Sequence, residues 1–364
     1  MINESRLLTP ENLECQIRSL EMPGAWILDV CAVQASYGHL LVLRTDGEIC
    51  GMNLDSGVIT RLCLVELPDL PSEEGHGNFG APALRLHSNT SGTYCAIVVD
   101  QGRKGILVDT SSGAITMVLD GGDYYEETVP FSACFLRVAD QDVFVYRSAW
   151  NRLDAADPAS GKSLTDRHIA PYEEAGPRPA HYLDYFHGRL WPSPDGSRIL
   201  DDGWVWHPVS VPRVWSATDW IRLNPWESED GASVVDLVFR DDWNTPACWI
   251  SERHVAIWGL VDSDDPEKSG KRPGVQISDA TSNDRSSDQQ WPMEEDQVPR
   301  ELFSDGKRLF VVDERGFSVW DIASRSRIAG LSNFSAHLHD AGRETLVAFG
   351  ENTVTELSLP WLAR

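Results

Sequence analysis

Hydrophobic residues in this chain come in short runs that are separated by tight polar turns. In residues 304–331, SDGKRLFVVDERGFSVWDIASRSRIAGL, three β-rich runs alternate with two turns and leave no room for a helix. The same order of runs and turns returns at residues 39–65, 93–119 and 142–164. In these three copies, the turn before the last run carries Gly57, Gly113 and Gly161. The pattern therefore predicts a repeated unit of antiparallel strands.

Each unit gains a fourth strand from a short β-rich run that precedes it. Four strands repeated at a period of about 40 to 50 residues are typical of β-propeller blades. We expect an all-β fold in which residues 1–364 form a single propeller domain of about seven four-stranded blades. The blades are expected to start near residues 26, 83, 133, 187, 246, 300 and 336. The last unit lacks one strand, which an N-terminal run at 13–20 is expected to supply, closing the ring.

Two short motifs resemble those of WD repeats. Residues 317–322, with the pair Trp320 and Asp321, resemble the strand ending of a WD-repeat blade. Residues 193–196 and 304–306 resemble the turn between the first and second strands of such blades. The Trp-Asp pair occurs at one blade end, and the Gly-His pair that usually opens a WD repeat is missing. The chain is thus similar to the wider WD-repeat-like and quinoprotein-like group of propellers, which implies a fold and no particular function.

The net charge of −25 is the strongest signal in the composition. Contacts to phosphate need Lys and Arg, so this charge argues against nucleic acid and against an anionic membrane as partners. No apolar run approaches the roughly 20 residues of a membrane span, and the sequence opens without a signal-peptide pattern, so a cytoplasmic protein is expected. Seven scattered Cys without a CxxC pair predict neither a disulfide framework nor a zinc site.

The acidic residues concentrate in the long connections. In a four-stranded blade, the connections from the second to the third strand and from the fourth strand to the next blade emerge on one face. We assign six long connections to this face, and they carry most of the net charge: residues 65–82, 120–132, 166–186, 221–244, 261–272 and 292–298. The turns on the opposite face are expected to be short, and residues 262–290 to form a loose acidic insertion. Long acidic loops on one rigid face predict a site for a basic protein partner.

Tryptophan residues sharpen the position of this site. Most of the 14 Trp lie between Trp191 and Trp258, and the loop 224–244 places two of them beside several carboxylates. Aromatic rings flanked by carboxylates suit Lys or Arg, through stacking and charge pairing. The predicted contact residues are Trp226, Glu227, Glu229, Asp230, Asp241, Asp242 and Trp243, with Asp123, Glu126, Glu127, Glu294, Glu295 and Asp296 elsewhere on the face.

Three functions remain open at this point. The favoured one is non-catalytic binding of a basic protein without a cofactor, in one concrete form as an inhibitor or immunity protein that covers the basic cleft of a nuclease-like toxin. The alternative is a metal-dependent propeller hydrolase or lyase with its site in the central channel. Asp201 and Asp202 are candidate calcium ligands for it, and His337 and His339 share one face of a strand. The third function is a scaffold that binds several partners weakly.

Overall fold

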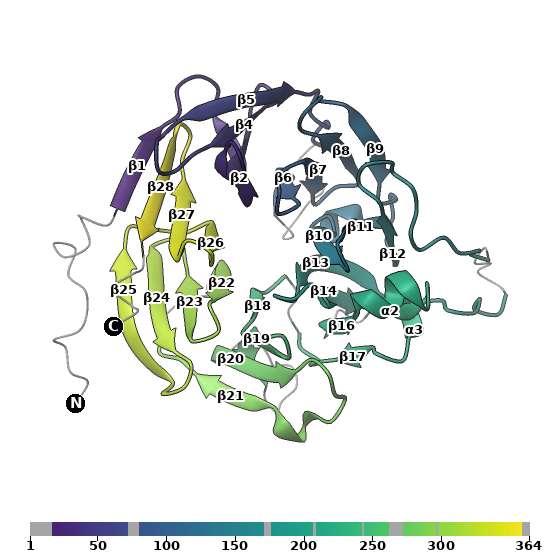
Figure 1. Cartoon of the computed structure of the whole chain (residues 1–364). Coiled ribbons are helices and arrows are strands. Elements are labelled where there is room, and N and C mark those ends of the chain that lie inside the picture. Colours follow the sequence, from purple (N-terminus) through teal and green to yellow (C-terminus); the bar gives the residue numbers. More distant parts are fainter. Residues whose placement is uncertain are drawn as a thin grey trace.

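Seven antiparallel sheets surround a central axis in the computed structural model of the chain (Figure 1). The structure describes residues 17–71, 80–170, 176–206, 209–241, 244–261, 272–295 and 298–358. Each sheet is one blade, and the innermost strands are β2, β6, β10, β13, β18, β22 and β26. The expected all-β propeller of seven blades is confirmed, and the first strands begin within two residues of the expected blade starts.

Five blades follow the simple order of strands, counted from the axis outward. Blade 1 consists of β2 (Ile27–Ala35), β3 (Gly38–Arg44), β4 (Glu48–Met52) and β5 (Ile59–Leu64). Blade 2 consists of β6 (Ala83–Ser88), β7 (Tyr94–Asp100), β8 (Lys104–Asp109) and β9 (Ile115–Asp120). Blade 3 consists of β10 (Ala133–Val138), β11 (Gln141–Ala149) and β12 (Arg152–Ala156), with an isolated bridge from Ala156 to Ser163 at its outer edge. Blade 5 consists of β18 (Ala247–Trp249), β19 (His254–Leu260), β20 (Arg272–Asp279) and β21 (Gln289–Pro292). Blade 6 consists of β22 (Glu301–Ser304), β23 (Arg308–Val312), β24 (Gly316–Asp321) and β25 (Ser326–Ser332).

Blade 7 joins the two ends of the chain. It consists of β26 (Leu338–Asp340), β27 (Thr345–Phe349), β28 (Thr353–Ser358) and, as its outermost strand, β1 (Ile17–Glu21). β1 pairs antiparallel with β28, from Ile17 opposite Leu357 to Glu21 opposite Thr353. Figure 1 shows the purple β1 beside the yellow β28. The expected closure by an N-terminal strand is therefore confirmed, although residues 13–16 of the expected strand lie outside the described residues.

The repeated turn has the same geometry in three blades. Gly57, Gly113 and Gly161 all have a positive φ, between 68° and 74°. Each donates its backbone N–H, at 2.8 Å, to the carbonyl oxygen four residues earlier. Glycine adopts this left-handed conformation without the steric cost that other residues meet. The sequence repeat thus reflects one turn that recurs between the third and fourth strands.

Blade 4 departs from the expected loop arrangement. It consists of β13 (Phe186–Pro192), β14 (Arg198–Val205), β16 (Arg213–Ser216) and β17 (Val235–Asp236), and the short β15 (Val209–Ser210) also pairs with β14. Between β16 and β17 the chain forms α2 (Ala217–Arg222) and α3 (Glu227–Asp230). The Ser216 hydroxyl accepts a hydrogen bond from the Asp219 N–H at 3.1 Å and caps α2 directly after the strand.

This arrangement corrects the assignment of residues 221–244 to one face. We call the face with the blade-to-blade connections, such as 121–132 and 237–246, the entry face, and the opposite one the turn face. Because α2 and α3 connect a third to a fourth strand, their segment leaves β16 on the turn face, whose connections are therefore not all short. The two-residue strand Val235–Asp236 that divides the segment is too short to recognise from the sequence.

The expected loose insertion at 262–290 is also wrong for most of its length. Residues 272–279 form β20, which pairs with β19 on one side and β21 on the other. The 3-10 helix η5 (Arg285–Ser287) follows β20. Residues 262–271 lie outside the described residues. The polar run at residues 281–288 is the connection from β20 to β21, and it masks the buried strand β20 that precedes it.

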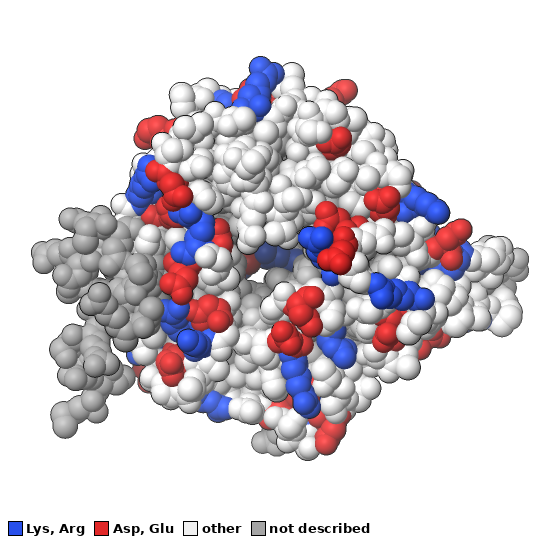
Figure 2. Space-filling model, in the orientation of Figure 1, with Lys and Arg blue, Asp and Glu red and all other residues white. Residues whose placement is uncertain are grey.

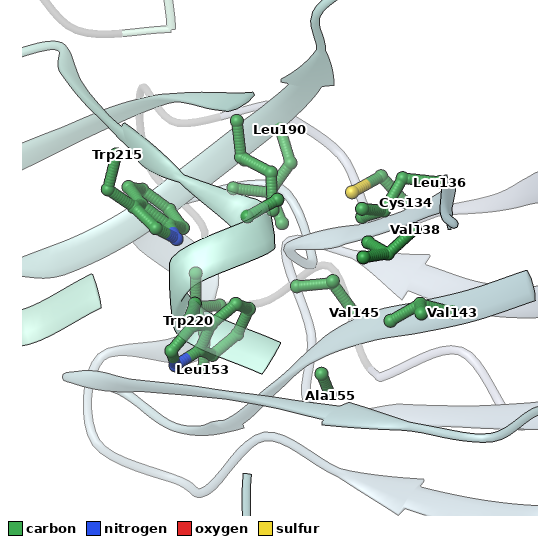
Figure 3. Close-up of a cluster of buried hydrophobic side chains, with 12 residues drawn as sticks. Cys134, Leu136, Val138, Val143, Val145, Leu153, Ala155, Leu190, Trp215 and Trp220 are labelled. Atoms are coloured by element: carbon green, nitrogen blue, oxygen red, sulfur yellow. The ribbon is translucent and has the colours of Figure 1, made fainter. Parts of the chain in front are cut away.

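The core lies between neighbouring blades. Leu40–Leu43 of β3 are completely buried, because both faces of a blade pack against its neighbours. One cluster between blades 3 and 4 contains Leu153, Trp215 and Trp220 (Figure 3). The Trp220 indole comes from α2 and donates to the Pro225 carbonyl oxygen at 3.0 Å. Two of the clustered tryptophans therefore hold α2 against the ring.

Within the described residues, no helix is long and apolar enough to cross a membrane.

Removal of β1 tests the ring closure. A chain that starts at residue 22 leaves β28 as an unpaired sheet edge, so we expect a lower melting temperature and association of monomers through that edge. A chain that starts at residue 17 keeps β1 and is the matched control. Calorimetry and size-exclusion chromatography measure both effects. Equal melting temperatures and equal monomer content of the two truncated chains would contradict the closing role of β1.

Candidate functional site

Trp226, predicted to hold a partner's cation, lies against a cation of the protein itself. The guanidinium carbon of Arg167 is 5.1 Å from the centre of the Trp226 ring. The His181 ring stacks on the same tryptophan, with ring centres 4.4 Å apart. Arg167 also donates to the Glu229 carboxylate at 2.5 Å, and both side chains are almost completely buried. The stacking and charge pairing expected from the sequence thus occur within the chain.

The other acidic residues of α3 are paired as well. The buried Glu227 carboxylate accepts hydrogen bonds from the Asn224 side chain at 2.9 Å and the Ser233 N–H at 2.8 Å. Burial by itself raises the pKa of Glu227, but these hydrogen bonds outweigh it and hold the pKa below its ordinary value. Asp230 is exposed and contacts His181 Nδ1 at 2.8 Å. These contacts fasten α3 to residues of the connection from blade 3 to blade 4.

Asp241 is separated from α3 by β17. Asp241 is half-buried in the connection from β17 to β18, on the entry face. Asp242 and Trp243 lie outside the described residues. The structure therefore does not bring the α3 carboxylates together with Asp241.

Glu294 and Glu295 precede blade 6 on the entry face. Glu294 is exposed, whereas Glu295 accepts hydrogen bonds from the Ser318 hydroxyl at 2.5 Å and from the Trp320 indole at 3.2 Å. Glu295 thereby connects the loop to the strand that carries the Trp-Asp pair. Asp296 lies outside the described residues.

An aromatic patch on the entry face, between blades 2, 3 and 4, was not expected from the sequence. It consists of Tyr124, Tyr125, Trp150, Phe186, Trp204 and Trp206. Phe186 and Trp204 are buried and stack with ring centres 4.2 Å apart. Tyr124, Tyr125 and Trp206 lie on this base and are 44%, 46% and 41% exposed. The patch is therefore rigid underneath and open to solvent above.

The backbone of Tyr125 turns the two tyrosines outward. Tyr125 has a φ of 51°, a left-handed conformation that is rare for a bulky residue. Its carbonyl oxygen accepts hydrogen bonds from the Thr128 N–H at 3.1 Å and the Thr128 hydroxyl at 2.8 Å. Residues held in such conformations are often found at binding sites. Surrounding contacts thus maintain a strained turn that presents aromatic rings.

Three of the predicted contact residues flank this patch. Asp123 is exposed and lies 3.5 Å from Arg103. Glu126 and Glu127 form the first turn of η3 (Glu126–Thr128) and are half-buried. Neither glutamate has an ion pair among the described residues. The expected combination of aromatic rings and carboxylates thus occurs on the entry face, with Tyr124, Tyr125 and Trp206 in place of Trp226.

The central channel forms a cavity of about 430 Å³. Residues in or just before the first strand of every blade line it, and they include Arg85, Arg189, Arg300, His87 and His337. Arg85 pairs with Asp100 at 3.0 Å, and Arg189 pairs with Glu301 at 2.8 Å. Figure 2 shows Lys or Arg side chains inside the central opening. Blade alignment would have revealed these arginines, since each stands near the start of a blade.

The candidate metal ligands have other partners. Asp201 contacts His187 Nδ1 at 2.6 Å, and Asp202 pairs with Arg240 at 2.7 Å, all four side chains being at most 2% exposed. His337 Nδ1 accepts a hydrogen bond from the Phe349 N–H at 3.3 Å. Among the described residues, no group of three His, Cys, Asp or Glu side chains is arranged to hold a metal ion.

Substitution of Arg167 tests the internal role of the α3 contacts. Arg167→Gln leaves the Glu229 carboxylate buried without its cation, so we expect a loss of about 3–5 kcal/mol in the free energy of unfolding. The control Arg178→Gln removes an exposed ion pair with Asp184 from the same connection and should cost about 0–1 kcal/mol. Denaturant titration compares the two variants. Equal losses would show that the Arg167 contact is not structural.

The channel histidines predict a pH dependence of stability. Burial, with a smaller contribution from neighbouring arginines, lowers the pKa of His87 and of His337 to about 4. Because a folded-state pKa below the ordinary value disfavours protonation in the folded state, stability is complete above about pH 6.5 and is lost as the pH falls towards 4. His87→Gln should reduce this loss, whereas His168→Gln, an exposed control, should not. Denaturant titrations between pH 4 and 7 measure the free energy of unfolding of each variant. If this free energy depends on pH equally in all variants, His87 is excluded as a cause.

The fold has counterparts among solved structures. No protein-family model and no curated protein matches the chain. A chain in the crystal structure of the mitotic checkpoint complex matches with a TM-score of 0.54 and 11% sequence identity, over 94% of this chain and 94% of that chain. That chain is a WD-repeat propeller. The present chain therefore has the fold of a WD-repeat-like β-propeller.

Proposed function

We propose that this propeller binds a basic protein partner through the aromatic patch and the carboxylates beside it on the entry face. Propellers of this fold commonly serve as protein-interaction scaffolds. The observation that carries the proposal is the exposure of Tyr124, Tyr125 and Trp206 on a buried aromatic base. Tyr and Trp that are held rigidly at a surface are the residue types that dominate protein interfaces.

The geometry of the patch favours a protein partner. Tyr125 and Trp206 meet edge to face with ring centres 5.4 Å apart, and the ring centres of Trp150 and Phe186 are 4.6 Å apart. These contacts fix the rings before a partner arrives, so little side-chain entropy is lost on binding. A partner that covers the three exposed rings would remove a large apolar area from water. Shape and rigidity thus support tight contact at this position.

The charges beside the patch favour Lys and Arg on the partner. Glu126 and Glu127 have no ion pair among the described residues, and Asp123 is largely exposed. A cationic side chain can stack on Tyr125 or Trp206 and pair with a neighbouring carboxylate at once. The net charge of −25 would also speed the encounter with a basic protein. Asp241 and Glu294 on the same face add to this field, and Asp242, Trp243 and Asp296 stay predicted contacts.

A nuclease-like toxin is one partner of this chemistry. Its active-site cleft must be basic in order to hold the phosphates of nucleic acid. An acidic surface with projecting aromatic rings could cover such a cleft and exclude the substrate. In this version of the proposal the protein acts as an inhibitor or immunity protein. If the partner is basic but has no nuclease activity, the binding proposal stands and the toxin version is wrong.

Substitution of Trp206 tests the proposed surface. Affinity capture from a lysate of the source organism identifies the partner, and calorimetry then measures its dissociation constant. Trp206→Ala should weaken binding by about 2 kcal/mol or more, the loss typical of an interface tryptophan. The double variant Glu126→Gln with Glu127→Gln should weaken binding more at low salt than at high salt, because the lost interaction is electrostatic.

Trp26→Ala is the matched control for this experiment. Trp26 is 53% exposed and also lies on the entry face, but it precedes blade 1. Its loss should leave the dissociation constant unchanged. If Trp206→Ala and the double variant bind as tightly as Trp26→Ala, the partner uses a different surface and the proposal is wrong.

A further inference from the structure

The central channel concentrates positive groups in a strongly acidic protein. Arg85, Arg189 and Arg300 reach it from blades 2, 4 and 6 and line the same cavity of about 430 Å³. A cavity of this size can hold a small organic molecule. The net charge of the chain is −25, so three arginines on the axis do not follow from its composition. Figure 2 shows positive side chains inside the opening and acidic side chains on the surface beside it.

The three guanidinium groups are not equally neutralised. Arg85 lies 3.0 Å from Asp100 and 3.9 Å from Asp29, and Arg189 makes two contacts with Glu301, at 2.8 and 2.9 Å. Arg300 donates one hydrogen bond to the Ala336 carbonyl oxygen at 2.5 Å. Among the described residues, no carboxylate lies within ion-pair distance of Arg300. Its remaining N–H groups are therefore available to a ligand.

Electrostatic repulsion acts among these arginines. Burial lowers the pKa of Arg300, Glu301 opposes this effect, and the charges of Arg85 and Arg189 add to it. A bound anion would relieve the repulsion and replace the hydration that burial removes. Asp29 and Asp100 also line the cavity and lie beside Arg85, so the position that favours negative charge is the one next to Arg300.

The channel histidines add hydrogen-bond donors. Because His337 Nδ1 accepts from the Phe349 N–H, the neutral imidazole carries its proton on Nε2. His87 Nε2 is buried and has no hydrogen-bond partner among the described residues. An orphaned buried polar atom in a cavity is a sign of a missing partner. His337 therefore adds a donor to the cavity, and His87 adds a ring nitrogen that is unpaired in the described part of the chain.

We propose that the axial channel is a binding site for a small organic anion that carries carboxylate or phosphate groups, held by Arg300 with Arg85, Arg189, His87 and His337. The guanidinium fork matches the planar carboxylate and the phosphate group equally well. This site is separate from the aromatic patch and does not depend on the protein partner. A ligand there would contact several first strands and so stabilise the closed ring.

Calorimetric titration with citrate and with inorganic phosphate, at constant ionic strength, tests this site. We expect one or both anions to bind the wild-type protein with a dissociation constant below about 1 mM. Arg300→Gln should raise that constant at least about tenfold, which corresponds to 1.4 kcal/mol. Binding of citrate alone assigns the site to carboxylates, and binding of phosphate alone assigns it to phosphorylated compounds.

Arg61→Gln is the matched control, because it removes one exposed guanidinium from the outermost strand of blade 1. It should bind the anion like the wild type. A second readout needs no variant: the imidazole signals of His87 and His337 should shift in the NMR spectrum of the wild type on titration, and those of the exposed His168 should not. The proposal is overturned if neither anion binds, if Arg300→Gln binds as tightly as Arg61→Gln, or if the His87 and His337 signals do not move.

Discussion

The pairing of β1 with β28 is the contact on which the rest of the structure depends. Five residue pairs join the two ends of the chain, from Ile17 opposite Leu357 to Glu21 opposite Thr353. Without this pairing, β28 would be an unpaired outer edge of blade 7, and no strand pairing would join the two ends of the chain. The aromatic patch and the channel both draw residues from several blades, so their geometry requires a closed ring. Local sequence forms the blades, whereas closure fixes their relative positions.

Most buried charges serve this architecture. Arg167 and Glu229 hold α3 against the ring, and Asp202 of blade 4 pairs with Arg240 in the connection to blade 5. Such pairs gain little over apolar packing, but the loss of one partner is costly. The net charge of the sequence therefore does not measure the charge available to a partner. Carboxylates without an ion pair in the described part of the chain, such as Glu126 and Glu127, carry more information about binding.

The sequence predicted the fold well because the blade is a local repeat. Gly57, Gly113 and Gly161 mark one turn whose backbone geometry recurs. The candidate site was harder to predict, because it depends on the face at which each connection emerges. The short β17 separates Glu227 and Glu229 from the entry-face connection that follows it, and the burial of these two residues could not be predicted from their charge. The aromatic patch was not predicted, because its rings come from separate parts of the sequence. The Tyr124–Tyr125 pair beside acidic residues was the one indication of it.

Hydrogen exchange of the protein with and without its captured partner tests the central claim most directly. The account predicts slower exchange of the backbone amides in residues 121–128 and 203–206, which carry Tyr124, Tyr125 and Trp206. The amides of α2 and α3 should exchange at the same rate in both samples. Slower exchange confined to α2 and α3, with no change in residues 121–128, would contradict binding at the aromatic patch.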